Sequence, residues 1–254
     1  MASFSAERHV LSEHRSNLIE KTGPDVVTMS GVHFAWPGGN LFEIAIDDFD
    51  LATGSRTLLV GPSGSGKSTL LSLLCGIVVP QAGQINILGT DIVRLSNAAR
   101  DRFRAEHIGV IFQMFNLLPY GSVVDNVALP LSFSQERRTR VAQRGGAAAE
   151  ASRLLGALGI NSSLLDGSAA ALSVGQQQRV AAARALIGTP ELIVADEPTS
   201  ALDYDHQQRF LDLLFRQIDE ACTTLLMVSH DRQMGSLFDD VLELEDVVTM
   251  RGPV

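Results

Sequence analysis

Residues 61–69 read GPSGSGKST and form the first stretch whose residue types and spacing could do chemistry. The stretch fits the pattern G-x-x-x-x-G-K-[ST] through Gly61, Gly66, Lys67 and Ser68. Glycines let backbone N–H groups approach an anion, and a helix that begins here adds the positive end of its dipole. We therefore expect nucleotide phosphates on this loop. Its predicted nucleotide-binding residues are Gly61, Pro62, Ser63, Gly64, Ser65, Gly66, Lys67, Ser68 and Thr69.

Two adjacent acids supply what such a loop needs for hydrolysis. Asp196 and Glu197 follow the wholly apolar run 192–195, which is typical of a buried parallel strand. Ligands of open α/β sheets bind where strands end. Asp196 is the predicted partner of Ser68 in holding Mg²⁺, and Glu197 is placed to orient a water for attack on the terminal phosphate. Alternatively, the two acids belong to a solvated turn, but the phosphate loop earlier in the chain favours the catalytic interpretation.

The elements that must position these residues alternate along the chain. Extended runs fill residues 26–51, and apolar strands are expected at 57–60, 108–112, 192–195 and 224–228. Helices are expected at 69–74 and 91–104, in several pieces over 122–165, and then at 181–187 and 205–221. Residues 241–244 and 247–250 read as a terminal hairpin. The pattern predicts an α/β protein.

The composition indicates which binding partners and which cellular compartment to expect for this protein. The 254 residues include 29 acidic and 20 basic side chains, a formal charge of −9, which disfavours nucleic acid as a partner. No apolar run approaches a membrane span, and the charged start does not resemble a signal peptide, so we expect a cytoplasmic protein. Cys75 and Cys222 stand in apolar runs and are expected to be buried and reduced. Between Arg100 and Arg144 the sequence has seven Arg against four acids, a local charge of +3, which is interpreted as a solvated helical face in preference to a lipid or partner contact.

Further motifs give the chain a family resemblance. LSVGQ at 172–176, SALD at 200–203, Gln113 and His230 accompany the loop and the acids, in an order and spacing similar to the nucleotide-binding subunits of ATP-binding cassette (ABC) transporters. There they correspond to the signature, the D-loop, the Q-loop and the switch histidine, with Walker A at 61–69 and Walker B at 192–197. The resemblance covers residues 26–244. It implies a P-loop NTPase (RecA-like) core with an antiparallel β-subdomain and an inserted helical subdomain at about 113–179, in a domain of residues 25–254 after a flexible extension of residues 1–24.

The resemblance also implies roles for single residues. Trp36 would stack on adenine. Gln113 would contact Mg²⁺ or the attacking water, and His230 would hydrogen-bond the γ-phosphate and hold the water of Glu197. The catalytic residues would thus be Glu197, His230, Gln113 and Lys67, with Ser68, Gln113 and Asp196 as Mg²⁺ ligands and ATP as the nucleotide.

The signature implies a partner. Ser173, Gly175 and Gln176 would close the ATP of a second copy in a head-to-tail dimer. Val174 replaces the glycine usual at its position, and because a β-branched residue excludes positive φ, we expect ordinary backbone there.

The expected function is ATP hydrolysis that powers a separate membrane permease, with the cassette held at the inner face of the membrane by that permease. The section 108–131 resembles the macrolide-efflux, lipoprotein-release and cell-division ATPases, which favours export or lipoprotein release. A mechanotransmission module is the main alternative, because it needs the same residues. An importer ATPase remains open too, while a soluble ABC ATPase of DNA repair or translation is disfavoured by the missing coiled coil or second cassette.

Overall fold

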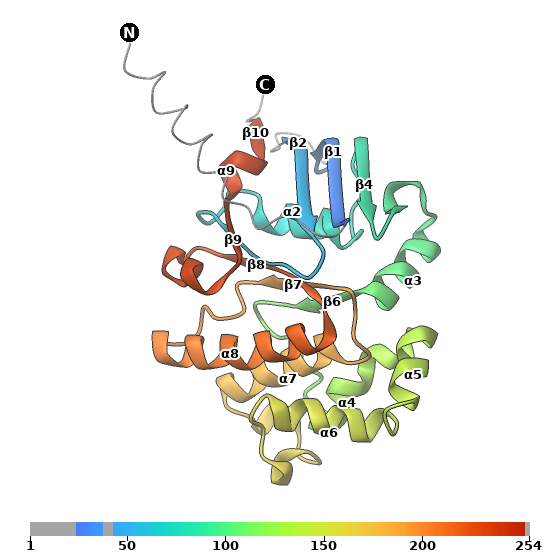
Figure 1. Cartoon of the computed structure of the whole chain (residues 1–254), viewed down its shortest axis with the longest axis vertical. Coiled ribbons are helices and arrows are strands. Elements are labelled where there is room, and N and C mark those ends of the chain that lie inside the picture. The colour runs from blue at the N-terminus through green and yellow to red at the C-terminus, as the bar shows by residue number, and fades with distance from the viewer. Residues whose placement is uncertain (1–23, 38–42, 252–254) are drawn as a thin grey trace.

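The computed structural model describes residues 24–37 and 43–251, and it contains two five-stranded sheets (Figure 1). The antiparallel sheet has the order β10-β2-β1-β4-β5 and the other sheet, whose paired strands are all parallel, the order β6-β7-β8-β3-β9. The strands are β1 (Asp25–Ala35), β2 (Glu43–Ala52), β3 (Arg56–Val60), β4 (Ala82–Ile87), β5 (Thr90–Asp91), β6 (Ile108–Ile111), β7 (Leu192–Asp196), β8 (Thr224–Ser229), β9 (Asp240–Glu243) and β10 (Thr249–Arg251). This is the predicted α/β P-loop architecture with an added antiparallel sheet.

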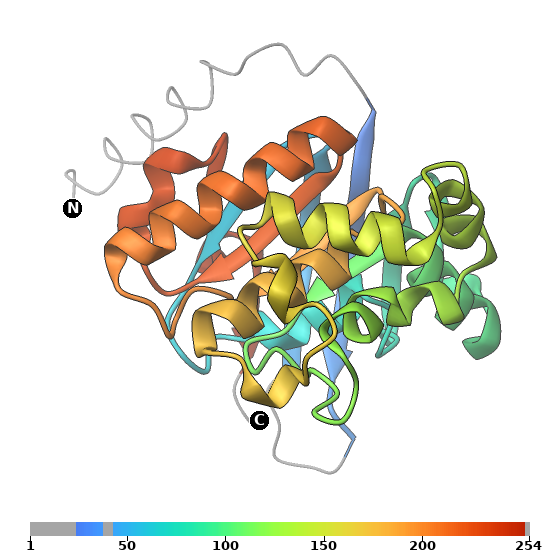
Figure 2. The same ribbon diagram turned by 90° about the horizontal axis from the view of Figure 1, so that it is seen from below.

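The α-helices divide between the two sides of the parallel sheet. α2 (Lys67–Leu74) lies between the two sheets, and most of the other helices lie on the far side of the parallel sheet (Figures 1 and 2). The remaining α-helices are α3 (Asn97–His107), α4 (Val123–Ala128), α5 (Gln135–Ala142), α6 (Ala147–Ala157), α7 (Val174–Leu186), α8 (Tyr204–Ala221) and α9 (Leu244–Val247). No helix in the described part of the chain is long and apolar enough to cross a membrane.

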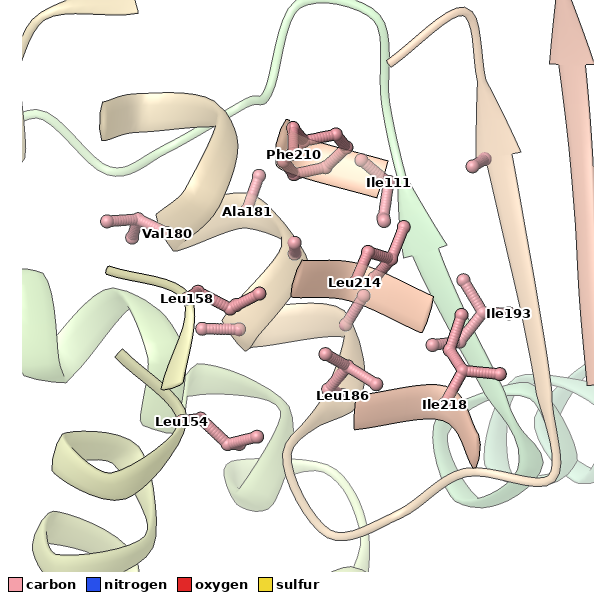
Figure 3. Packing of buried hydrophobic residues seen from close by; sticks show 14 of the residues in the cluster. Ile111, Leu154, Leu158, Val180, Ala181, Leu186, Ile193, Phe210, Leu214 and Ile218 are labelled. Atoms are coloured by element: carbon pink, nitrogen blue, oxygen red, sulfur yellow. The ribbon is translucent and has the colours of Figure 1, made fainter. Parts of the chain in front are cut away.

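Side-chain alternation along the parallel strands builds two apolar cores. In β7, Ile193 and Ala195 join the core under α7 and α8, whereas Leu192 and Val194 join the core that contains α2. Figure 3 shows the first core, where Ile193 meets side chains of α8 such as Ile218. Both faces of the sheet are therefore buried, which explains why its strands are continuous apolar runs.

The terminal hairpin prediction is wrong. β9 pairs in parallel with β3, α9 follows it at once, and β10 pairs antiparallel with β2 in the other sheet. The alternating apolar residues do indicate strands here, but the pattern carries no information on which strand each one joins.

Three smaller predictions need correction. Cys222 is exposed, because it adopts left-handed backbone (φ 52°) in the turn that ends α8. Arg137 is 1% exposed and donates to the backbone carbonyls of Glu106 and Ile187, so this arginine is not solvated, whereas Arg138 is exposed. The helix expected at 91–104 is a 3-10 turn followed by α3, which Ser96 caps. The expected extension 1–24 lies almost wholly outside the described residues.

Candidate active site

The phosphate loop connects β3 to α2, at the carboxyl end of a central parallel strand. Gly64 and Gly66 have φ values of 79° and 96°, which other residues rarely adopt. Gly66 directly precedes α2, and no side chain caps the first turn of that helix. The free N–H groups of this turn can therefore bind an anion.

Three charged or titratable side chains meet at this loop, one at the start of α2 and the other two directly after β7 and β8. The Lys67 ammonium donates to the carbonyls of Gly61 (2.7 Å) and Pro62 (3.0 Å), and it lies 3.2 Å from Glu197 Oε1. The other oxygen of Glu197, Oε2, lies 3.1 Å from His230 Nδ1. Lys67 and Glu197 are largely buried, so their charges interact with little screening.

Glu197 occupies a strained backbone position. Its φ is 42°, in the left-handed region, and its N–H donates to the carbonyl of Val228 in β8 at 3.0 Å. Such conformations cost about 1–3 kcal/mol and persist where surrounding contacts hold them. The sequence pattern located Glu197 at a strand end and carried no signal of this strain.

Oxygen ligands suited to a divalent cation lie beside the loop. The Ser68 hydroxyl is 3.4 Å from Asp196 Oδ2, and hydroxyl and carboxylate oxygens are the ligands that Mg²⁺ prefers. Burial, together with the negative charge of Glu197, raises the pKa of Asp196. A cation bound between these oxygens would relieve that repulsion, so the residues present fit Mg²⁺.

A cavity of about 460 Å³ joins the loop to the antiparallel sheet. Trp36 lines it, packs edge-on against Phe34 at 5.2 Å between ring centres, and donates from Nε1 to Thr69 Oγ1 at 3.2 Å. The predicted site residues that line it are Trp36, Ser63, Gly64, Gly66, Lys67, Ser68, Thr69, Gln113, Asp196 and Glu197. Gly61, Pro62, Ser65 and His230 line a neighbouring cavity of about 480 Å³ on the loop.

Sequence reasoning missed two apolar residues of the first cavity. Ile44 of β2 and Met250 of β10 also line it, beside Trp36. An apolar side chain in a strand is more often core, so no signal in the sequence distinguishes these two. They come from segments about 200 residues apart, and only the pairing of β10 with β2 brings them together.

The predicted signature residues Ser173, Gly175 and Gln176 are not among the described residues that line either of these cavities. They begin α7, where the Ser173 hydroxyl accepts from the Gln176 N–H and the Gln176 side chain accepts from the Ser173 N–H. Val174 is the first helical residue, with the ordinary backbone predicted for it, and its side chain is 51% exposed.

A parallel sheet with a glycine loop, a lysine and two acids at its strand ends defines a P-loop nucleotide-hydrolysing protein. A model of the ABC transporter family matches residues 45–200, more than half of the chain. The chain belongs to this family and is the ATP-hydrolysing subunit of an ABC transporter. Cassettes of this kind form dimers and work with membrane permeases.

Relatives support the same assignment. The uncharacterized ABC transporter ATP-binding protein YbbA of Escherichia coli is 42% identical over 75% of this chain and 81% of its own length. The lipoprotein-releasing system ATP-binding protein LolD of Psychrobacter arcticus is 40% identical over 78% of this chain and 85% of its own. Among solved structures, the dimeric post-hydrolysis state of the ATP-binding cassette MJ0796 with ADP and Pi is 30% identical. It covers 89% of this chain and 98% of its own, with a TM-score of 0.75.

Proposed function

We propose that ATP binds in the cavity beside Trp36, with its phosphates on the loop and its adenine against the indole ring. Ser68, Gln113 and Asp196 would hold Mg²⁺, which supplies positive charge to the phosphate oxygens when bound. The observation that carries the proposal is the convergence of Lys67, at the start of α2, with Glu197 and His230, which follow β7 and β8.

Each of these three side chains would have a separate role in ATP hydrolysis. Lys67 is free to exchange its backbone carbonyls for phosphate oxygens. Glu197 would then accept a hydrogen bond from a water aligned with the terminal phosphate, and His230 would donate to the phosphate and hold the carboxylate in place. The water is oriented by groups that already lie within 3.2 Å of one another, so little reorganisation is needed.

Closure of the site requires a second copy of the chain. The N-terminus of α7 carries Ser173, Gly175 and Gln176, yet these residues do not line either of the two cavities described at the phosphate loop. A head-to-tail dimer would place this helix terminus, with its partial positive charge, against the ATP of the partner. ATP then holds the dimer together, and hydrolysis releases it.

Size-exclusion chromatography with Mg²⁺ and ATP tests this function. Glu197→Gln should elute as a dimer, because it retains the loop and loses the group that orients the water. Lys67→Ala should remain a monomer under the same conditions, since it loses the charge that holds the phosphates. Equal elution of the two variants contradicts the proposal, and the wild type without nucleotide is the control for association that does not depend on ATP.

A permease docking site is the second part of the proposal. A groove of about 530 Å³ lies beside β6 and is lined by apolar residues that include Ile77, Phe112 and Phe133, with exposed fractions of 57%, 38% and 67%. Asp101 and Arg104 line the same groove and offer charges to a polar edge. We assign its occupant to a cytoplasmic segment of a separate permease, which would keep this cassette at the inner membrane face. The name of the relative LolD favours release or export.

Purification of tagged Glu197→Gln with ATP from solubilised native membranes tests the partner. A co-purified permease with few spans and a large extracytoplasmic domain supports release, export or the mechanotransmission alternative, and transport of a labelled substrate separates these. A permease with many spans, or a solute-binding protein, would indicate an importer. Phe133→Asp should lose the permease while it retains ATP-dependent dimerisation. Absence of any membrane protein would favour the soluble alternative.

A further inference from the structure

Helix α7 carries two polar side chains that are buried and lie beyond its signature residues. Gln178 is 1% exposed and donates from Nε2 to the carbonyl of Pro198 at 2.8 Å. Arg184 is 8% exposed and donates from Nη1 to the carbonyl of Asn116 at 2.7 Å and from Nη2 to the carbonyl of Phe115. One helix therefore contacts two separate loops of the chain through side chain-to-backbone hydrogen bonds.

Both loops belong to the active site of this same chain. Pro198 directly follows Glu197, and Phe115 and Asn116 lie two and three residues after Gln113. Phe115 and Asn116 both adopt left-handed backbone, with φ values of 57° and 50°. Two consecutive residues in this region are costly without glycine, so the loop needs an external hold. The guanidinium of Arg184 supplies it.

Arg184 occupies this place at a cost to stability. Burial lowers the pKa of its guanidinium, since desolvation disfavours the charged form. An aliphatic side chain would fill the same space without a desolvated charge. The two carbonyl contacts, which only a forked donor can make together, are the structural reason for an arginine here.

We propose that Gln178 and Arg184 are positioning residues that make α7 a rigid link between the two ATP sites of the dimer. This inference rests on the head-to-tail dimer proposed above. In that dimer the N-terminus of α7 closes the ATP of the partner. A shift of this helix would then move the Glu197 and Gln113 loops of its own chain through the hydrogen bonds of Gln178 and Arg184.

The packing of α7 favours transmission as a unit. All residues from Val180 to Leu186 are buried, so the helix cannot bend or slide without disturbing the core. Arg184 and Asn116 also line the groove assigned to the permease. The same hydrogen bonds therefore lie between that groove and the ATP site.

Two substitutions break the link, and two on the same helix are matched controls. Gln178→Met and Arg184→Met remove the contacts to the site loops. Gln177→Met removes a hydrogen bond to the carbonyl of Leu172 just before the helix, and Arg179→Met removes one to the carbonyl of Gly159. Gln178 Oε1 has no hydrogen-bond partner, so methionine there also removes a buried unpaired acceptor and the fold should tolerate it.

The readouts are ATP affinity of the monomer and the rate and Hill coefficient of the ATPase. We expect unchanged ATP affinity for all four variants. kcat should fall about fivefold in Gln178→Met and about tenfold in Arg184→Met, as expected for one neutral and one charged donor. The Hill coefficient for ATP should fall from about 2 towards 1 in both, because the sites become independent. Gln177→Met and Arg179→Met should behave as the wild type.

Two results would overturn the inference. One is that Gln178→Met and Arg184→Met match their controls in rate and cooperativity, and the other is that the wild type itself has a Hill coefficient of 1. In either case, ATP-dependent dimerisation of Glu197→Gln would show that the proposed function stands. If that variant fails to dimerise, the proposed function fails first, and the link between sites fails with it.

Discussion

Gly61→Ala is predicted to destabilise the protein through one contact far away in the sequence. A Cβ at Gly61 would lie 2.9 Å from Leu244 Cβ, 3.0 Å from Ser65 Oγ and 3.3 Å from Leu244 Cδ2. Carbon atoms normally approach to about 3.5 Å, so the phosphate loop or α9 must move by about 0.6 Å. Leu244 is 1% exposed, so its position is held by the residues packed around it.

Overpacking of this kind costs about 1–3 kcal/mol. For a chain of this size each kcal/mol lowers Tm by about 2–4 °C, so Gly61→Ala should lower Tm by about 2–12 °C. Thermal unfolding followed by circular dichroism measures the shift, and ATP affinity should fall with it because the loop itself moves. Leu244→Gly removes both of the clashing carbons. Ser65 Oγ still lies 3.0 Å from the added Cβ in that background, so Gly61→Ala should cost less there without becoming neutral, which a double-mutant cycle would detect.

Gly64→Ala separates crowding from backbone strain. Gly64 has φ 79°, and a Cβ there would meet nothing within 4 Å. Alanine at this position should therefore be destabilising through its backbone conformation alone, and Leu244→Gly should not rescue it. The reasoning is refuted if Gly61→Ala is as stable as the wild type, or if its cost is the same with Leu244 present and absent.

Three further predictions concern the remaining parts of the chain. Ser173→Ala should lower the ATPase rate more than Val174→Gly, because it removes the predicted phosphate contact and also the cap of α7, which is worth about 1 kcal/mol. Steady-state kinetics measures both rates, and the reverse order would contradict the role given to Ser173. Trp36→Ala should weaken ATP binding about tenfold and Trp36→Phe less, as titration with a fluorescent nucleotide would measure. Burial alone would raise the pKa of Glu150, but hydrogen bonds and charge from Arg153 outweigh it and hold the pKa below its usual range. The ionised form is therefore favoured in the folded state, so the stability that Glu150→Gln removes is present at neutral pH and disappears as acid takes the pH below about 4.3. Urea unfolding between pH 7 and pH 3 should show the two proteins converging.

The parts of the site that sequence could predict are those set by local pattern. The glycine loop, Asp196 and Glu197 each stand directly at the end of an apolar run, and parallel strands bring their carboxyl ends to one edge. The family resemblance then supplied Gln113 and Trp36, which line the cavity beside the loop. The loop and the two acids were predicted from signals within a few positions of each residue, whereas Gln113 and Trp36 were predicted only through the order and spacing of motifs along the chain.

Local sequence patterns could not predict the contacts of long side chains or the pairing of the last strands in the chain. Arg137 was placed in solvent because its neighbours are polar, yet its guanidinium reaches the end of α7 between two backbone carbonyls. The last strands were paired with each other because they are adjacent in sequence, yet each joins a different sheet. Local pattern says which residues can be buried or extended, and tertiary packing decides what they meet.

This difference explains why the chemistry of the site is visible in the sequence while its alignment is not. The phosphate loop packs against Leu244, the loop after Glu197 is held by Gln178, and the loop after Gln113 is held by Arg184. Each contact joins segments at least 20 residues apart, and each acts on backbone rather than on substrate. Substitutions at these positions should therefore change how the reacting groups are arranged while the groups themselves remain. At Gln178 and Arg184 we expect a loss of turnover and cooperativity without a loss of ATP binding. At Gly61 we expect a loss of both stability and ATP binding.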